Sequence, residues 1–238
     1  MIPPMRSLRR AMIHADEWRW HGRFVVCRRL GRAPIIGPTL TRVDNHLYLK
    51  HFSRDMQRLN DALAGTELAD HYWVWAGALL GWAREGAPLA HDRDADFALL
   101  TQHRDLLERA IPVICRAGFT PYRRFRNNDG ELTEVTFRRH RARFEFFLFT
   151  PVEGGLRYYL YRGTPHQPVE FEGRLPDQDL VEFEFLERRW LRHSNAEAEL
   201  ESLYGNWQVA DPYWDYMRDN QSKVQERAWL GTDEPWSC

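Results

Sequence analysis

The sequence His91-Asp92-Arg93-Asp94-Ala95-Asp96-Phe97-Ala98-Leu99-Leu100 changes from alternating carboxylates to an apolar run. The pattern predicts a strand over Asp94–Leu100 that runs into the core. Alternate side chains of a strand share a face, so Asp94 and Asp96 point the same way, and Asp92 joins them if the strand begins early. Close carboxylates repel each other and need a cation, and hard oxygen ligands suit Mg²⁺, with Mn²⁺ as the alternative. A solvated acidic turn paired with Arg93 explains the local run equally well.

The residues before this strand form a candidate phosphate site. Residues 71–76 are aromatic and β-branched, which predicts a buried strand, and Gly77 then opens a short helix. Backbone N–H groups at a helix N-terminus bind phosphate, and an arginine such as Arg84 can hold phosphate oxygens with its forked donors. A plain turn between strand and helix is the alternative. The residues expected to bind the donor or the acceptor are Gly77, Ala78, Gly81, Trp82, Arg84 and His91.

A third carboxylate stands alone in an apolar strand. Glu145 lies within the run Phe144-Glu145-Phe146-Phe147-Leu148-Phe149. An unpaired buried charge is avoided in proteins, so Glu145 needs an arginine, a proton or a metal. Arg141 or Arg143 is the structural alternative for a partner. The preferred interpretation is a metal shared with Asp94 and Asp96.

Periodicity in the rest of the chain predicts an α+β fold. Apolar residues at helical spacing predict helices after Asp44 or Asn45, after Thr101 and over residues 195–204. Strands are predicted over residues 71–76, 94–100, 119–125, 131–138, 144–149, 157–161 and 181–185. This order is typical of a mixed β-sheet with helices packed on one side. We expect an N-terminal extension (1–44), a catalytic domain (45–216) and a C-terminal tail (217–238).

Composition excludes several classes of protein. The formal net charge of -1 argues against a protein that coats nucleic acid or an anionic membrane. Cys27, Cys115 and Cys238 are distant and odd in number, so neither a disulfide framework nor a zinc site follows, and a reducing compartment fits best. No stretch approaches the roughly 20 apolar residues that span a bilayer. The expected location is the cytoplasm, with no nucleic-acid partner and no transmembrane segment.

Residues 75–100 resemble the signature of the fukutin/LicD family of phosphotransferases. That family places a glycine with a hydroxyl residue, a Leu-Gly-x-x-Arg element and an acidic Asp-hydrophobic-Asp element in this order. Residues 144–149 are similar to its second carboxylate-bearing strand. Tyr204-Gly205-Asn206-Trp207 is similar to its Tyr-Gly-x-x-Trp element, for which a structural role at a helix end is expected.

The resemblance implies a nucleotidyltransferase-like fold and an activity. Characterised relatives transfer a phosphorylated alcohol, such as phosphocholine or ribitol phosphate, from a CDP-linked donor to a glycan hydroxyl. The metal carboxylates then correspond to Asp94, Asp96 and Glu145, with Asp92 as an additional candidate. These residues would hold one or two Mg²⁺ ions beside the donor phosphates.

Three departures from the family pattern leave alternatives open. Ala78 replaces a hydroxyl residue, Arg93 interrupts the acidic run, and Glu145 stands where aspartate is usual. One alternative is a nucleotidyltransferase that uses a nucleoside triphosphate to modify a small hydroxylated acceptor. The other is a non-catalytic nucleotide-binding domain of the same fold.

Overall fold

The computed structural model describes residues 37–90, 92–162, 168–211 and 213–237, with side chains from Leu49 onward. The chain divides into two compact units, Met1–Lys50 and His51–Cys238. The described part of the first unit is helical. The second unit contains the sheet and the candidate site, and its architecture is given below. Residues 1–36 of the predicted N-terminal extension, and the predicted pocket residue His91, lie outside the described residues.

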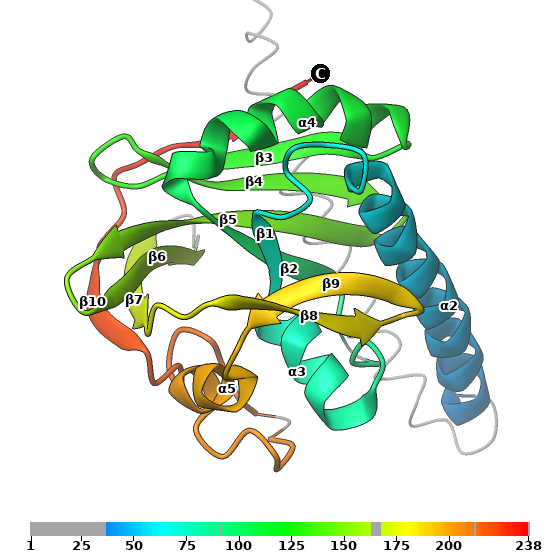
Figure 1. Cartoon of the computed structure of the whole chain (residues 1–238). Helices are drawn as coiled ribbons and strands as arrows, with labels where there is room; N and C mark the ends of the chain where they lie inside the picture. Colours follow the sequence, from blue (N-terminus) through cyan, green and yellow to red (C-terminus); the bar gives the residue numbers. More distant parts are fainter. Residues whose placement is uncertain (1–36, 91, 163–167, 212, 238) are drawn as a thin grey trace, which may run out of the picture. The chain divides into compact units, whose positions relative to one another are not determined.

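The second unit is built on a curled, mixed β-sheet (Figure 1). The strands in chain order are β1 (Tyr72–Trp75), β2 (Asp94–Leu100), β3 (Thr120–Arg126), β4 (Leu132–Arg139), β5 (Ala142–Val152), β6 (Gly155–Arg162), β7 (Val169–Leu175), β8 (Leu180–Phe185), β9 (Arg188–His193), β10 (Lys223–Ala228) and β11 (Asp233–Pro235). The sheet runs in the order β10-β7-β6-β5-β4-β3-β11, while β2 pairs with β5 and β1 pairs with β2. The hairpin β8-β9 forms a separate ladder. The predicted α+β class with a mixed sheet is confirmed.

The structure describes four α-helices. They are α2 (Gly37–Leu63), α3 (Ala76–Glu85), α4 (Arg104–Arg116) and α5 (Ala196–Tyr204). Apolar side chains of α2 from Phe52 onward and of α4 are buried against the sheet. Phe52, for example, packs on Phe144 of β5 with ring centroids 6.0 Å apart. Helix α3 follows β1 directly and contacts both β1 and β2.

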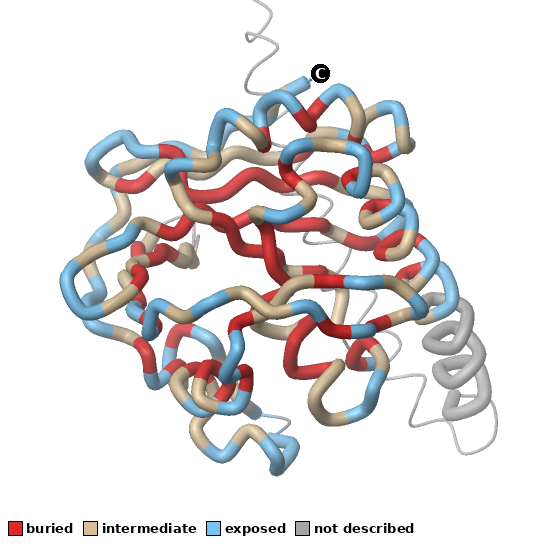
Figure 2. Tube along the Cα trace, viewed as in Figure 1, coloured by how far each residue is buried: buried red, intermediate tan, exposed pale blue. Residues whose placement is uncertain are grey.

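Strand β5 organises the sheet because it has different neighbours along its length. Its first part pairs in parallel with β2, from Asp94 opposite Arg143 to Leu100 opposite Phe149. Its last residues pair antiparallel with β6. β4 lies along its other edge. Figure 2 shows that these central strands are mostly buried. A charged residue on β5 therefore sits in the middle of the molecule rather than at an edge.

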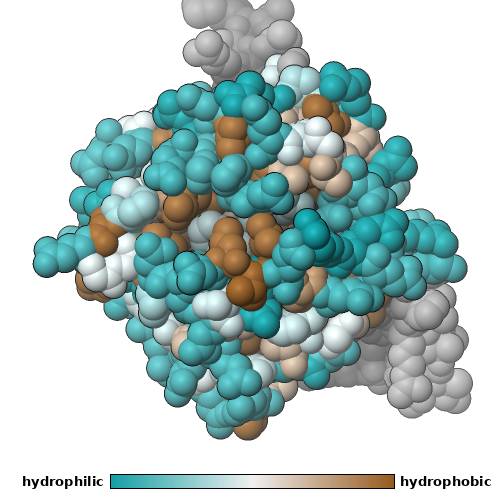
Figure 3. Space-filling model, in the orientation of Figure 1, coloured by the Kyte–Doolittle hydropathy of each residue, from teal (hydrophilic) through white to brown (hydrophobic). Residues whose placement is uncertain are grey.

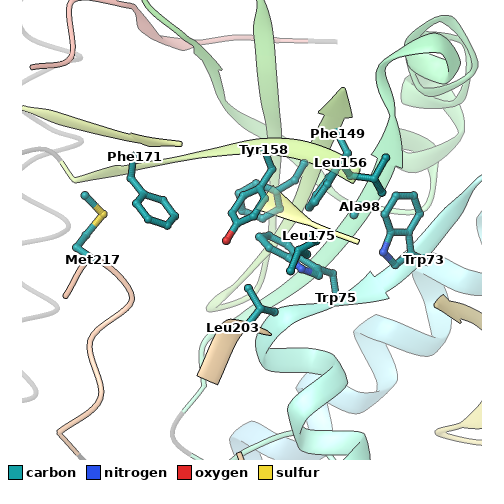
Figure 4. Close-up of a cluster of buried hydrophobic side chains, with 11 residues drawn as sticks. Trp73, Trp75, Ala98, Phe149, Leu156, Tyr158, Phe171, Leu175, Leu203 and Met217 are labelled. Carbon is teal, nitrogen blue, oxygen red and sulfur yellow. The ribbon is translucent and has the colours of Figure 1, made fainter. Parts of the chain in front are cut away.

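The two faces of the central strands differ in chemistry. Phe97 and Phe146 point toward the helix-covered face, where their rings lie 5.2 Å apart. On the opposite face, at the β1 side, an apolar cluster surrounds Trp75 and includes Phe149, Tyr158 and Leu203 (Figure 4). Asp94, Asp96, Arg143 and Glu145 alternate with the helix-facing residues, so they share this second face. Burial of the aromatic cluster fixes β1, β2 and β5 beside the charged residues.

Several strands were not predicted from the sequence. β7 and β9 were not predicted, and the predicted tail (217–238) contributes β10 and β11, which pair with β7 and β3. β10 is largely exposed and β11 is very short. Neither has the alternation of buried and exposed residues that identifies a strand in sequence. Helix α2 also begins at Gly37, before the predicted cap at Asp44.

Two further observations bear on the sequence analysis. Cys27 and Cys238 lie outside the described residues, so what the sequence analysis inferred from the three cysteines stays a prediction. Among the described helices, none is long and apolar enough to span a bilayer. The view in Figure 3 shows a mostly hydrophilic surface with a small apolar area near its middle.

Candidate active site

The parallel register of β2 and β5 gathers the predicted carboxylates. Asp94 lies opposite Arg143, and Asp96 lies opposite Glu145. Paired positions on neighbouring strands are about 4.8 Å apart, and both pairs point to the same face of the sheet. The structure therefore brings Asp94, Asp96 and Glu145 together from segments that are far apart in the sequence.

Arg143 lies among these carboxylates. Its Nη2 donates to Asp94 Oδ2, and its Nε lies 3.1 Å from Glu145 Oε1. The side chain of Arg143 is 42% exposed, whereas that of Glu145 is 11% exposed. The guanidinium thus neutralises two carboxylates at once and keeps one side toward solvent. Sequence analysis named Arg143 only as a structural partner for Glu145, and that ion pair is present.

The N-terminus of α3 completes the cluster. The backbone N–H of Gly77 donates to Asp96 Oδ2 over 3.2 Å. A Cβ at Gly77 would collide with Asp92 Oδ2 and would lie 3.4 Å from Asp96 Oδ2. The sequence analysis predicted that Gly77 allows a phosphate to approach. In the structure it allows two carboxylates to approach, and its N–H donates to Asp96, while phosphate binding at Gly77 stays a prediction. The turn before it is strained, because Ala76 has a φ of 46°.

Burial and mutual repulsion set the charge of the cluster. Burial, and next to it the charge of Asp94, hold the pKa of both Asp92 and Asp96 well above the usual range. Burial also raises the pKa of Glu145 to about 7, although Arg143 opposes the rise. The pKa of Asp94 is lowered despite its burial, because Arg143 stabilises the carboxylate. The cluster therefore carries more carboxylates than Arg143 alone can neutralise.

The carboxylates of the cluster suit a hard divalent cation, but in this structure they are not arranged to bind one. Asp92, Asp94, Asp96 and Glu145 supply only carboxylate oxygens, the ligands that Mg²⁺ and Mn²⁺ prefer. Among the described residues, however, no three acidic, histidine or cysteine side chains are placed to hold a metal ion as they stand. Arg143 stands between Asp94 and Glu145 and forms an ion pair with each. Metal binding at these oxygens requires the guanidinium to move.

The polar face continues beyond Glu145 onto β4. Thr136 lies opposite Glu145, and its Oγ1 donates to Glu134 Oε1 over 2.7 Å. Burial holds the pKa of Glu134 well above its usual range, and the charge of Glu145 adds to this. Sequence analysis missed Glu134. The sequence does hold a signal, a single carboxylate beside a threonine within the strand Leu132–Arg139, because a lone charge inside a strand needs a partner.

Tyr204 brings α5 to the same cluster. The tyrosine is half-buried, and its desolvation, followed by the charges of Asp96 and Asp92, raises its pKa well above the usual range. Its ring packs on Trp214 with centroids 4.6 Å apart. The Tyr-Gly-x-x-Trp element was expected to be structural. The structure places its tyrosine within electrostatic reach of the aspartates.

The other predicted binding residues that the structure describes make packing contacts or hydrogen bonds with other parts of the chain. Ala78 is buried within α3. Gly81 packs against the following loop, where a Cβ would lie 2.7 Å from the Ala87 carbonyl oxygen. Trp82 packs edge-on against Phe183 of the β8-β9 hairpin, with ring centroids 4.8 Å apart.

Arg84 also serves a structural contact. Its Nε donates to the Trp207 carbonyl oxygen, and its Nη2 donates to the Val209 carbonyl oxygen over 3.0 Å. These bonds tie α3 to the segment that follows α5. A side chain held in this way has fewer donors left for the phosphate that the sequence analysis assigned to it.

Comparison with models of protein families gives a match to part of the chain. Residues 70–155 match the model of the LicD/FKTN/FKRP nucleotidyltransferase domain. The matched range contains β1 to β5 and with them every carboxylate of the cluster. No curated protein matches the chain.

Proposed function

We propose a transferase function on the premise that residues 70–155 form a LicD/FKTN/FKRP nucleotidyltransferase domain, which supports membership of the LicD/fukutin family. The family indicates phosphotransferase or nucleotidyltransferase-like activity. Within that range we propose Mg²⁺-dependent transfer of a phosphorylated alcohol from a CDP-linked donor to a hydroxyl of a glycan or another acceptor. Phosphocholine and ribitol phosphate exemplify the transferred group.

One observation carries this proposal. Asp94, Asp96 and Glu145 meet on adjacent parallel strands, at the point where the Gly77 N–H opens α3. Asp92 joins them across Gly77. Asp94, Asp96 and Glu145 would hold Mg²⁺. When bound, the metal would neutralise the donor phosphates, which is the main requirement of phosphoryl transfer.

The residues of the chain would then position the reactants. In the proposed reaction the acceptor hydroxyl oxygen attacks the phosphorus of the transferred group. The bond from that phosphorus to the CMP oxygen breaks, and CMP leaves. Asp92 is our candidate for receiving the hydroxyl proton, because it lies beside Gly77 at the cluster and is left over once the other three carboxylates hold the metal. Partial burial of the carboxylates strengthens the electrostatic interactions at this site.

A nucleotidyltransferase reaction is the second candidate, and the description of the matched domain favours it. Here a nucleoside triphosphate would donate a nucleotidyl group to a small hydroxylated acceptor, with pyrophosphate as the leaving group. The same carboxylates would serve both reactions.

The two reactions are separated by their products. Purified protein is incubated with Mg²⁺ and an acceptor mixture, together with CTP, ATP, CDP-choline or CDP-ribitol. Release of CMP supports phospho-alcohol transfer, and release of pyrophosphate supports nucleotidyl transfer. Nucleotide binding without either product would support the non-catalytic alternative, for which the departures at Ala78, Arg93 and Glu145 would be the cause.

A further inference from the structure

We propose that Arg143 is the phosphate-binding cation of this site, and that without metal it occupies the place among the carboxylates that a divalent cation takes. Metal entry would turn the guanidinium from Asp94 and Glu145 toward the donor phosphates. The inference rests on the proposed function, since it presumes a metal and a phosphate-bearing donor. It adds a residue that was not among the predicted substrate-binding residues.

Arg143 and a metal ion would compete for the same carboxylate oxygens. Arg143 bonds to Asp94 Oδ2 and lies 3.1 Å from Glu145 Oε1. A metal ligated by these two side chains would bring a second cation against the guanidinium. Two cations at contact distance repel each other, so one of them leaves. Because metal ligands must be close and direct, while a guanidinium on a flexible stem can reorient, Arg143 is the cation that moves.

The surroundings of Arg143 indicate where its guanidinium can move. Its 42% exposure shows an open side, in contrast to the nearly closed Glu145. On the neighbouring strand, Arg138 lies directly opposite Arg143. The charges of Arg123 and Arg138 both act on Glu145, so positive charge extends along this face past the cluster. A donor diphosphate beside the metal would meet this positive edge.

The guanidinium of Arg143 has the hydrogen-bond donors that recognise a phosphate. A guanidinium presents parallel N–H donors that match two oxygens of a phosphate, as they match the two carboxylates now. Phosphate oxygens would therefore replace Asp94 and Glu145 as acceptors without leaving Arg143 unpaired. Arg84, the arginine predicted from sequence, is instead bonded to the Trp207 and Val209 carbonyl oxygens.

The test measures binding rather than turnover. Wild type and Arg143→Met are titrated calorimetrically with MgCl2 or MnCl2 alone, and then with CDP at saturating metal. Arg141→Met is the matched control, because Arg141 is an exposed arginine in the turn that precedes β5. We expect Arg143→Met to bind the metal several-fold more tightly, since a competing cation is gone. The same variant should bind CDP about tenfold to a hundredfold more weakly, the loss of a charged hydrogen-bonded pair. Arg141→Met should match wild type in both titrations.

The opposite signs of the two effects make the test decisive. If wild type shows no metal-dependent CDP binding, the proposed function fails and the inference about Arg143 is overturned with it. If wild type binds CDP with metal but Arg143→Met binds it equally well, or binds metal more weakly, Arg143 is only a structural ion pair and the inference is overturned. Should Arg143→Met not fold, Arg143→Lys decides. It keeps the charge but loses the fork, so several-fold weaker CDP binding supports the inference, and unchanged binding refutes it.

Discussion

At the scale of single residues, the carboxylates of the cluster are not equivalent. Asp94 is stabilised as an anion by Arg143, whereas burial and neighbouring charges make ionised Asp96 unfavourable. Both would serve the metal in the proposed reaction. Substituting them should therefore have the same effect on activity and opposite effects on the stability of the metal-free protein.

We expect Asp94→Asn and Asp96→Asn each to lower transfer to a few per cent of wild type or less. Without metal, Asp96→Asn should raise the melting temperature by about 2–4 °C, because roughly 1 kcal/mol of repulsion is relieved. Asp94→Asn should lower it by a similar amount, because it breaks the bond to Arg143. Product assays and melting curves in EDTA check both. Substantial turnover in either variant would remove that residue from the metal site.

Glu145→Gln distinguishes a metal ligand from a structural ion pair. Arg143 keeps Asp94 as a partner in this variant. Burial already disfavours the ionised Glu145, as its raised pKa shows, so removing the charge should change stability little, by about 1 kcal/mol or less. That is well below the roughly 3–5 kcal/mol lost when a guanidinium is left unpaired in the interior. Activity and the stabilisation by Mg²⁺ with CDP should disappear together. Melting curves with and without these ligands measure this. A large loss of stability with an unchanged ligand-induced shift would exclude Glu145 from the active site.

At the scale of elements, the site depends on how closely α3 approaches β2. Gly77 is the point of contact, because its N–H bonds to Asp96 and its missing side chain leaves room for Asp92. The strained Ala76 turn and the buried strand Tyr72–Trp75 hold this junction. The junction is therefore specific to glycine although the backbone of Gly77 is not left-handed.

We expect Gly77→Ala to lower kcat/KM at least about a hundredfold, because the new Cβ displaces Asp92 by an ångström or more. Gly65→Ala is the matched control, since nothing lies within 4 Å of a Cβ there. That variant should keep wild-type activity. Near-normal activity of Gly77→Ala, with metal affinity unchanged, would show that Asp92 plays no part in the reaction.

At the scale of the whole molecule, the site is a group of charged side chains beside an aromatic core. The apolar cluster around Trp75 and the helix-covered face fix the strands, and as a consequence Glu145 is buried and the three aspartates are half-buried. Folding without metal therefore carries a cost that depends on pH. The direction follows from the raised pKa of Glu145, Asp92 and Asp96.

The metal-free protein should become more stable as pH falls from above 7 toward 4.5. Folded Glu145 has a pKa of about 7 against an ordinary value of 4.5. The folded state therefore takes up a proton before the unfolded state does, and this stabilisation is lost again as pH rises through 7. Asp92 and Asp96 act in the same direction, while the lowered pKa of Asp94 acts below this window. Denaturant titrations in EDTA between pH 5 and 8 measure the trend, and Glu145→Gln should flatten it. Falling stability over that range as pH is lowered would contradict the assigned burial.

The sequence by itself determined the local pattern of this protein. Alternation in the run from Asp92 to Leu100, and the lone Glu145 among phenylalanines, identified the central strands and the faces of their carboxylates, because side-chain direction along a strand follows from local geometry. The tertiary structure decided the partners. Register placed Arg143 between Asp94 and Glu145, gave the Gly77 N–H to Asp96 and turned Arg84 toward Trp207. It also recruited β10 and β11, whose pairing comes from neighbouring strands. Such contacts join distant segments, and no local pattern encodes which charged group meets which.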